Sequence, residues 1–170
     1  MIWVIFFVVL LFGFVVFFGA PYVPTKKSDL VRAFDELYTL DNSDTLVDIG
    51  SGDGVVLRLA AKRGAQAIGY EINPLLVILS RFLSRSDPLV IVHFASFWHA
   101  KLTPETTVVY VFGDSRDIVK MTDKVRESAT EMKHSIALIS YGFDVPGLVP
   151  QKKVGAHYLY QIEPLQISEA

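Results

Sequence analysis

Two carboxylates and a glycine-rich segment are the features of this sequence best suited to chemistry. The segment VDIGSGDG (47–54) carries Asp48 and glycines at alternate positions, and Glu71 follows within GYEINP (69–74). Glycines allow a backbone to approach a bound molecule closely. An ionised carboxylate can accept hydrogen bonds from two hydroxyl groups at once. The pattern therefore predicts a ligand site made of a backbone loop and two carboxylates.

The spacing of the glycines separates the possible ligands. A dinucleotide fingerprint, G-x-G-x-x-G, counted from Gly50 and Gly52 would place its third glycine at position 55, which is Val55. The third glycine is Gly54 instead, and Asp48 would lie beside any bound pyrophosphate. A cationic or neutral ligand tolerates such a carboxylate, so the pattern disfavours a nicotinamide oxidoreductase. A structural turn without a ligand remains the alternative.

Apolar strands alternate with helices along the chain, which predicts a doubly wound α/β domain with a mostly parallel sheet. In such folds ligands bind at the carboxyl ends of the strands, where both the glycine segment and Glu71 fall. Asn73 and Pro74 are typical of the cap and first position of a helix. We expect strands at 45–50, 67–72, 89–94, 107–112, 135–141 and 157–164, and helices at 28–40, 55–64, 74–85 and 117–132.

The chain begins with an uncharged apolar segment. No charged side chain occurs from Met1 to Ala20, and the first is Lys26. About 20 residues at 1.5 Å each can cross a hydrocarbon core of roughly 30 Å. A cleaved signal peptide is the competing interpretation, but the segment lacks a basic start and Pro21 disfavours cleavage after it. A buried core helix is the third interpretation of this segment, although the segment has no polar face.

We therefore expect a transmembrane anchor at 1–20, a connector with an amphipathic helix at 21–41, and a ligand-binding domain at 42–170. Basic residues follow the span and none precedes it, which predicts a cytoplasmic domain. No clear matrix-targeting segment precedes the span, which favours a bacterial inner membrane over a mitochondrial one.

Composition excludes several kinds of site. The chain has no cysteine, so it has neither a disulfide nor a thiolate metal site. Its four histidines show no ligand spacing, and we expect no metal. The net charge of −2 gives no electrostatic reason to expect nucleic acid.

The D-x-G-x-G-x-G segment resembles motif I of the class I S-adenosylmethionine (SAM) methyltransferases. The resemblance implies that Asp48 lies near the cofactor's amino group, and that Glu71 accepts both ribose hydroxyls. It implies that Ser96 and Phe97, in FASFWH (94–99), lie at the adenine, although Phe97 could equally belong to the core. The other residues implied at the cofactor are Gly50, Ser51, Gly52, Gly54, Ile72 and Asn73.

A narrower resemblance covers the chain from the apolar segment to VVYVFG (108–113). The order of an apolar span, PYVPT (21–25), VDIGSGDG and GYEINPLLV is similar to a family of membrane-anchored protein-lysine methyltransferases. Its mitochondrial members modify the ATP synthase c subunit and the ADP/ATP carrier. The resemblance implies that Tyr22 and Thr25 belong to the cofactor pocket or the acceptor channel. A proline-rich connector is otherwise more often a spacer.

The segment after the fourth strand bears on the acceptor. It reads FGDSRD (112–117) and lacks the Asn/Asp-Pro-Pro-Tyr/Phe motif of methyltransferases that act on nucleobases or amides. Asp114 is the candidate carboxylate for orienting an amine, and otherwise caps the next helix. An anchor raises the effective concentration of membrane-bound acceptors. We expect lysine methylation of a membrane protein; a lipid or quinone-like acceptor, or a non-catalytic membrane adaptor, remains the alternative.

Overall fold

The computed structural model describes residues 2–3, 27–112 and 117–165. None of the helices in these ranges is long and apolar enough to cross a membrane. Apart from Ile2 and Trp3, the predicted anchor lies outside the described residues, as do Tyr22, Thr25 and Asp114. The proposed assignments for those positions therefore remain predictions.

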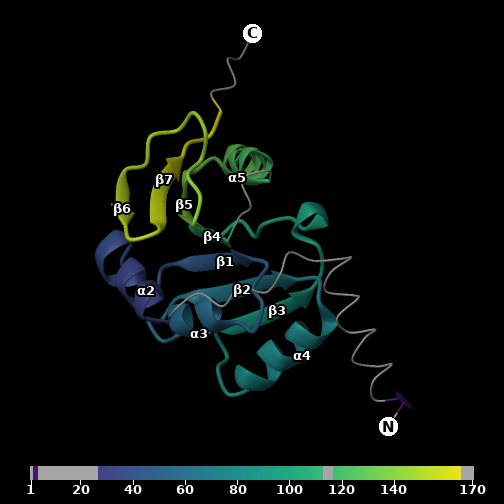
Figure 1. Ribbon diagram of the computed structural model, residues 1–170. Coiled ribbons are helices and arrows are strands. Elements are labelled where there is room, and N and C mark those ends of the chain that lie inside the picture. The colour runs from purple at the N-terminus through teal and green to yellow at the C-terminus, as the bar shows by residue number, and fades with distance from the viewer. Residues whose placement is uncertain (1, 4–26, 113–116, 166–170) are drawn as a thin grey trace.

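The described chain forms a seven-stranded sheet in the order β3-β2-β1-β4-β5-β7-β6 (Figure 1). Neighbours from β3 to β5 are parallel, whereas β7 is antiparallel to both β5 and β6. The predicted doubly wound, mostly parallel sheet is confirmed. The strands are β1 (Thr45–Ile49), β2 (Gln66–Glu71), β3 (Val90–Phe94), β4 (Val108–Phe112), β5 (Ile136–Tyr141), β6 (Lys152–Val154) and β7 (His157–Ile162).

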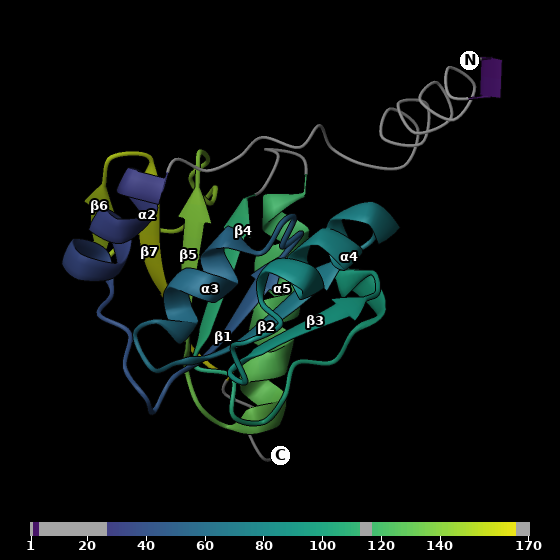
Figure 2. The same ribbon diagram turned by 90° about the horizontal axis from the view of Figure 1, so that it is seen from below.

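Helices cover both faces of this sheet (Figures 1 and 2). The helices are α2 (Lys27–Arg32), the π-helical turn η1 (Ala33–Leu37), α3 (Val55–Ala61), α4 (Pro74–Leu83), the 3₁₀ turn η2 (Phe97–His99) and α5 (Ile118–Met132). One core cluster joins η1, α3 and α4 to the sheet, through residues such as Phe34, Leu57 and Val77. The other joins α5 to the opposite face, through Ile118 and Val125.

The structure differs from the predicted elements in three places. The single helix expected at 28–40 is α2 followed by η1, and it ends before Tyr38, which is extended. The Tyr38 hydroxyl donates to the carboxylate of Asp44 at 3.0 Å, which fastens this segment beside the start of β1. Strand β6 was not predicted because its three residues, two of them lysines, show no apolar alternation. The turn η2 was also missed.

Candidate functional site

The glycine loop lies where the strand order reverses. β1 has β2 on one side and β4 on the other, so the residues after β1 lie at the switch point of the sheet. Gly50, Gly52 and Gly54 have φ values of 73°, 55° and 79°. Side-chain-bearing residues rarely adopt these left-handed conformations, which explains the alternating glycines. Gly54 directly precedes α3 as its N-cap.

Strand β2 positions the glycine loop through backbone hydrogen bonds. The backbone N–H groups of Gly50 and Ser51 both donate to the carbonyl of Tyr70, at 2.9 and 3.1 Å. Gly69 provides the space for this contact, since a Cβ there would lie 2.5 Å from the Ser51 hydroxyl and 2.6 Å from Leu57. Sequence analysis missed the role of Gly69. An isolated glycine within a strand often marks such a close approach, and that signal was available.

Glu71 connects two backbone segments through one carboxylate. It is the last residue of β2 and is 7% exposed. One oxygen accepts from the Gly52 N–H at 2.9 Å, and the other accepts from the Asn73 N–H at 2.7 Å. A carboxylate has about four lone-pair positions, so each oxygen retains one acceptor position for a ligand hydroxyl. Asn73 in turn caps α4 by accepting from the Leu75 N–H at 3.0 Å.

Asp48 supplies a second, more deeply buried carboxyl group. It lies in β1 and is 3% exposed. Burial raises the pKa of Asp48 well above its usual range, and the nearby carboxylates of Glu71 and Asp53 raise this pKa further. Arg58 forms an ion pair with Asp53, at 3.5 Å. A ligand cation beside Asp48 would favour the ionised carboxylate.

These features fit SAM, the cofactor that the resemblance to methyltransferase motif I implied. A Cβ added to Gly50 would meet no atom of the described residues within 4 Å, which leaves room for a ligand at this glycine. Glu71 offers acceptors for a pair of hydroxyls, and buried Asp48 offers a partner for an ammonium group. SAM carries a ribose diol and an amino group, which match this pair of carboxylates.

The other predicted cofactor residues lie at the carboxyl ends of β2 and β3. Ile72 is 44% exposed beside Glu71. Ser96 follows β3 as the N-cap of η2. The Phe97 side chain is 5% exposed and packs in the α5-side core against Tyr70. This position fits the core alternative for the ring; whether the backbone of Phe97 contacts the adenine remains a prediction.

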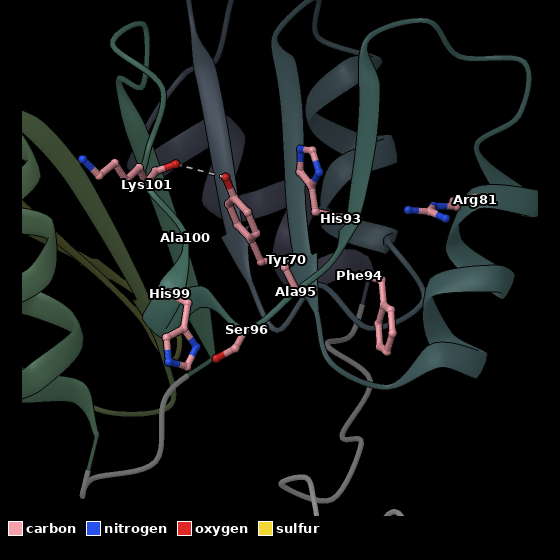
Figure 3. Close-up of a pocket in the computed structure, with 9 residues that line it drawn as sticks. All are labelled: Tyr70, Arg81, His93, Phe94, Ala95, Ser96, His99, Ala100 and Lys101. Atoms are coloured by element: carbon pink, nitrogen blue, oxygen red, sulfur yellow. Dashed lines mark hydrogen bonds between the residues drawn. The ribbon is translucent and has the colours of Figure 1, made fainter.

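A cavity of about 470 Å³ lies on the α5 side of the β2–β3 edge, lined in part by Tyr70, His93, Ser96 and Lys101 (Figure 3). The Tyr70 hydroxyl crosses it to donate to the Lys101 carbonyl at 3.3 Å. Of the predicted cofactor residues, Ser96 alone lines this cavity, and neither the glycine loop nor the two carboxylates do. We therefore place the cofactor site above the loop and not in this cavity.

Aromatic side chains gather at the carboxyl end of β5. The ring of Tyr141 lies 5.2 Å from that of Phe112 and 4.6 Å from that of His157, between centroids. His157 is 1% exposed, and its Nε2 lies 3.1 Å from the Tyr110 hydroxyl. Burial lowers the pKa of His157 to about 4, so the ring is neutral at pH 7. The sequence alone gave His157 no role at this site.

Comparison with known proteins identifies the family. The sequence profile of the ANTKMT methyltransferase domain matches residues 48–152, which include both carboxylates and the glycine loop. The chain belongs to this family. The predicted class I SAM methyltransferase domain is confirmed.

Curated relatives resemble most of the chain but are longer. The lysine N-methyltransferase of the ATP synthase c subunit from Xenopus laevis is 31% identical over 138 residues, covering 79% of this chain and 58% of the relative. The protein of the same name from Caenorhabditis elegans is 31% identical over 135 residues, covering 74% of this chain and 68% of that relative. The chain thus spans less than two thirds of the Xenopus relative.

A solved structure of similar size shares the fold. An RNA methyltransferase from Salinibacter ruber, in complex with S-adenosyl-L-homocysteine, is 29% identical and superposes with a TM-score of 0.71. The superposition covers 87% of this chain and 98% of that protein. A bound product of SAM in this relative agrees with the fit of the loop and carboxylates to SAM. Among the described residues, no group of histidine and acidic side chains could hold a metal ion.

Proposed function

We propose that this protein is a SAM-dependent methyltransferase that methylates the side-chain amine of a lysine in a membrane protein. The observation that carries the proposal is the convergence of Asp48, the glycine loop and Glu71 at the switch point of a family-matched domain. The names of the curated relatives support the choice of lysine.

The cofactor residues act mainly by positioning. SAM supplies a methyl group that its sulfonium has already activated. Glu71, fixed by the N–H groups of Gly52 and Asn73, accepts from the ribose hydroxyls. Asp48 pairs with the amino group, and the loop backbone packs against the ribose and methionine part. Because the donor is already reactive, the protein contributes orientation and exclusion of water.

The acceptor amine must be neutral to attack the methyl group. The aromatic cluster of Phe112, Tyr141 and neutral His157 gives the carboxyl end of β5 an uncharged lining. An amine that enters such surroundings loses hydration, which lowers its pKa and favours the neutral form. Asp114 then orients the amine, and Tyr22 and Thr25 belong to the cofactor pocket or the acceptor channel. These three roles are predictions for residues outside the described ranges.

Residues 1–20 anchor the enzyme in a membrane, with the methyltransferase domain in the cytoplasm of a bacterial cell in this proposal. The support is the uncharged apolar sequence and the basic residues that follow it. An anchor restricts the active site to the vicinity of the bilayer, which favours acceptors that are themselves in the membrane.

RNA is the second candidate acceptor, because the Salinibacter protein of comparable length is an RNA methyltransferase. The net charge of −2 weighs against it, since nucleic-acid binding depends strongly on contacts from basic residues to phosphates. Lysine is therefore the acceptor we propose.

A labelling experiment distinguishes these acceptors. The full-length protein is incubated with isotopically labelled SAM and with membranes or total RNA, and the label is located after digestion. We expect label in methylated lysine of a membrane protein. We also expect Glu71→Ala to lose this labelling. Glu105→Ala, a matched change at an exposed position, should keep it. Label in RNA or lipid would contradict the lysine assignment, and failure to bind SAM would contradict the activity itself.

A further inference from the structure

Helix α4 exposes its large apolar side chains instead of burying them. Its outward residues have high exposed fractions: Leu75 45%, Ile78 64%, Leu79 43%, Phe82 60% and Leu83 41%. These five residues are called the α4 surface below. Scattered apolar residues are ordinary on a protein surface, but a contiguous patch of large ones marks an interaction site.

Serines take two of the three buried positions at α4, whereas an ordinary amphipathic helix buries its large apolar side chains. Val77 and Ser80 are the buried residues of the helix, and Ser84 is buried directly after it. Neither serine Oγ has a hydrogen-bond partner among the described residues. The serines of α4 thus face the sheet, and its leucines and phenylalanine face outward. If the helix were rotated by half a turn about its axis, the apolar side chains would be buried and the serines exposed. An aqueous surface does not account for that arrangement.

Close packing explains the serines. A Cβ added to Gly54 would collide with the Ser80 hydroxyl, so α4 approaches the glycine loop at this point. The guanidinium of Arg81 donates to the Val92 carbonyl of β3 at 2.7 and 3.0 Å, which holds the helix in this orientation. The outward position of the α4 surface therefore follows from contacts to the cofactor loop and to the edge strand.

Charge identifies the kind of partner. Residues 72–86 contain Arg81 and Arg85 and no acidic residue. The Arg85 guanidinium lies 4.5 Å from the centroid of the Phe82 ring, at the rim of the α4 surface. Apolar side chains flanked by arginine are typical of helices that lie in the interface of a bilayer containing anionic lipid. Residues 1–20 of this chain carry no charged side chain, so as an occupant they would offer these two guanidinium groups no anionic partner.

The chain length between the apolar segment and the domain fits a bilayer contact. Residues 21–26 can span at most about 20 Å before α2 begins. Asp29 of α2 acts electrostatically on His157, which pairs with Tyr141 at the carboxyl end of β5. Helix α4 also begins at the carboxyl edge, directly after β2. The first described residue after the predicted anchor, Lys27 of α2, thus lies toward the same edge of the sheet as the first turn of α4.

We propose that the α4 surface lies in the headgroup region of an anionic bilayer and forms a second membrane contact. This inference rests on the membrane anchoring of the proposed function and adds the orientation of the domain. The anchor alone would leave the domain free to turn. Contact at α4 holds the carboxyl edge of the sheet, and with it the site, near the bilayer.

The absence of cysteine makes a direct test simple. Ile78→Cys in the full chain is compared with Glu127→Cys, an exposed position on α5 on the opposite face. Both are placed in vesicles of phosphatidylcholine with and without phosphatidylglycerol. With the anionic lipid, we expect a water-soluble maleimide to label Ile78→Cys about tenfold more slowly than Glu127→Cys. A fluorophore at residue 78 should be quenched by nitroxide-labelled lipid.

Other outcomes overturn the proposal. Equal labelling of the two cysteines would show that α4 faces water. If Ile78→Cys is protected from the maleimide but the fluorophore is not quenched by lipid, residues 1–20 would be packed on the α4 surface. If the protection depends on the protein-to-lipid ratio, a second copy of the chain would cover that surface. SAM binding by calorimetry on the same samples separates this inference from the proposed function. Intact binding with a water-exposed α4 rejects the membrane contact alone.

Discussion

Asp48 shows how one buried carboxyl group can oppose folding and favour binding. Its side chain is buried near the carboxylates of Glu71 and Asp53, and its pKa is raised above the ordinary value of 3.8. In the unfolded chain this group therefore loses its proton at lower pH. The stability that protonated Asp48 contributes is complete below the unfolded pKa and is lost as pH rises through the folded one.

The first prediction is that Asp48→Asn stabilises the protein and weakens SAM binding. At pH 7 the amide carries no charge, so we expect a higher melting temperature than in the wild type. The same change removes the partner of the SAM amino group, and should weaken binding about 10- to 100-fold. Differential scanning calorimetry and titration calorimetry measure the two effects. A variant with lower stability and unchanged SAM affinity would contradict this account of Asp48.

The second prediction concerns the stability of the protein at low pH. Burial lowers the pKa of His157 from 6.5 to about 4, so the contribution of this group to stability is complete above pH 6.5 and decreases as pH falls toward 4. The expected contribution of this group to the loss is about 3 kcal/mol. Urea unfolding between pH 7.5 and 4.5 should show a flatter profile in His157→Gln. His99→Gln, at an exposed position, should retain the wild-type slope.

At the scale of elements, the glycine loop depends on the strand beneath it. The third prediction is that Gly69→Ala lowers stability by about 1–3 kcal/mol and weakens SAM binding, because the new methyl collides with Ser51 and Leu57. Adding Ser51→Gly removes one of the two obstacles and should recover part of the melting temperature. A Gly69→Ala variant with normal stability would show that the loop is not seated as described.

The sequence predicted those strands and helices whose pattern of apolar and polar residues matches the burial of their side chains. Apolar runs and turn residues located six strands, and the spacing of Asp48, the glycines and Glu71 predicted a candidate cofactor site whose geometry fits SAM. Three residues of β6 carry no such pattern, and only pairing with β7 makes them a strand. The outward face of α4 was not predictable either. Its composition predicted a helix, but which face is buried depends on contacts of Ser80 and Arg81 with distant segments.

At the scale of the whole molecule, the proposed anchor and the methyltransferase domain have separable roles. The fourth prediction is that deletion of residues 1–20 leaves SAM affinity unchanged when it is measured without membranes. The deletion should lower the rate of methylation of a membrane-embedded acceptor by about 100-fold or more. A water-soluble lysine peptide should be methylated equally by both forms. Calorimetry and labelled-methyl transfer measure these quantities. A proportional loss with both acceptors would indicate damage to the domain instead of loss of membrane localisation.

The carboxylate of Glu71 touches both the cofactor loop and the turn that starts α4, through Gly52 and Asn73. Because Asn73 caps α4, a ligand that orders this carboxylate would also order the start of that helix. Thermodynamic linkage is reciprocal: whatever free energy SAM adds to the contact between α4 and lipid, lipid adds to the affinity for SAM. The enzyme would then sense its own location, with cofactor affinity set by whether the domain rests on a bilayer.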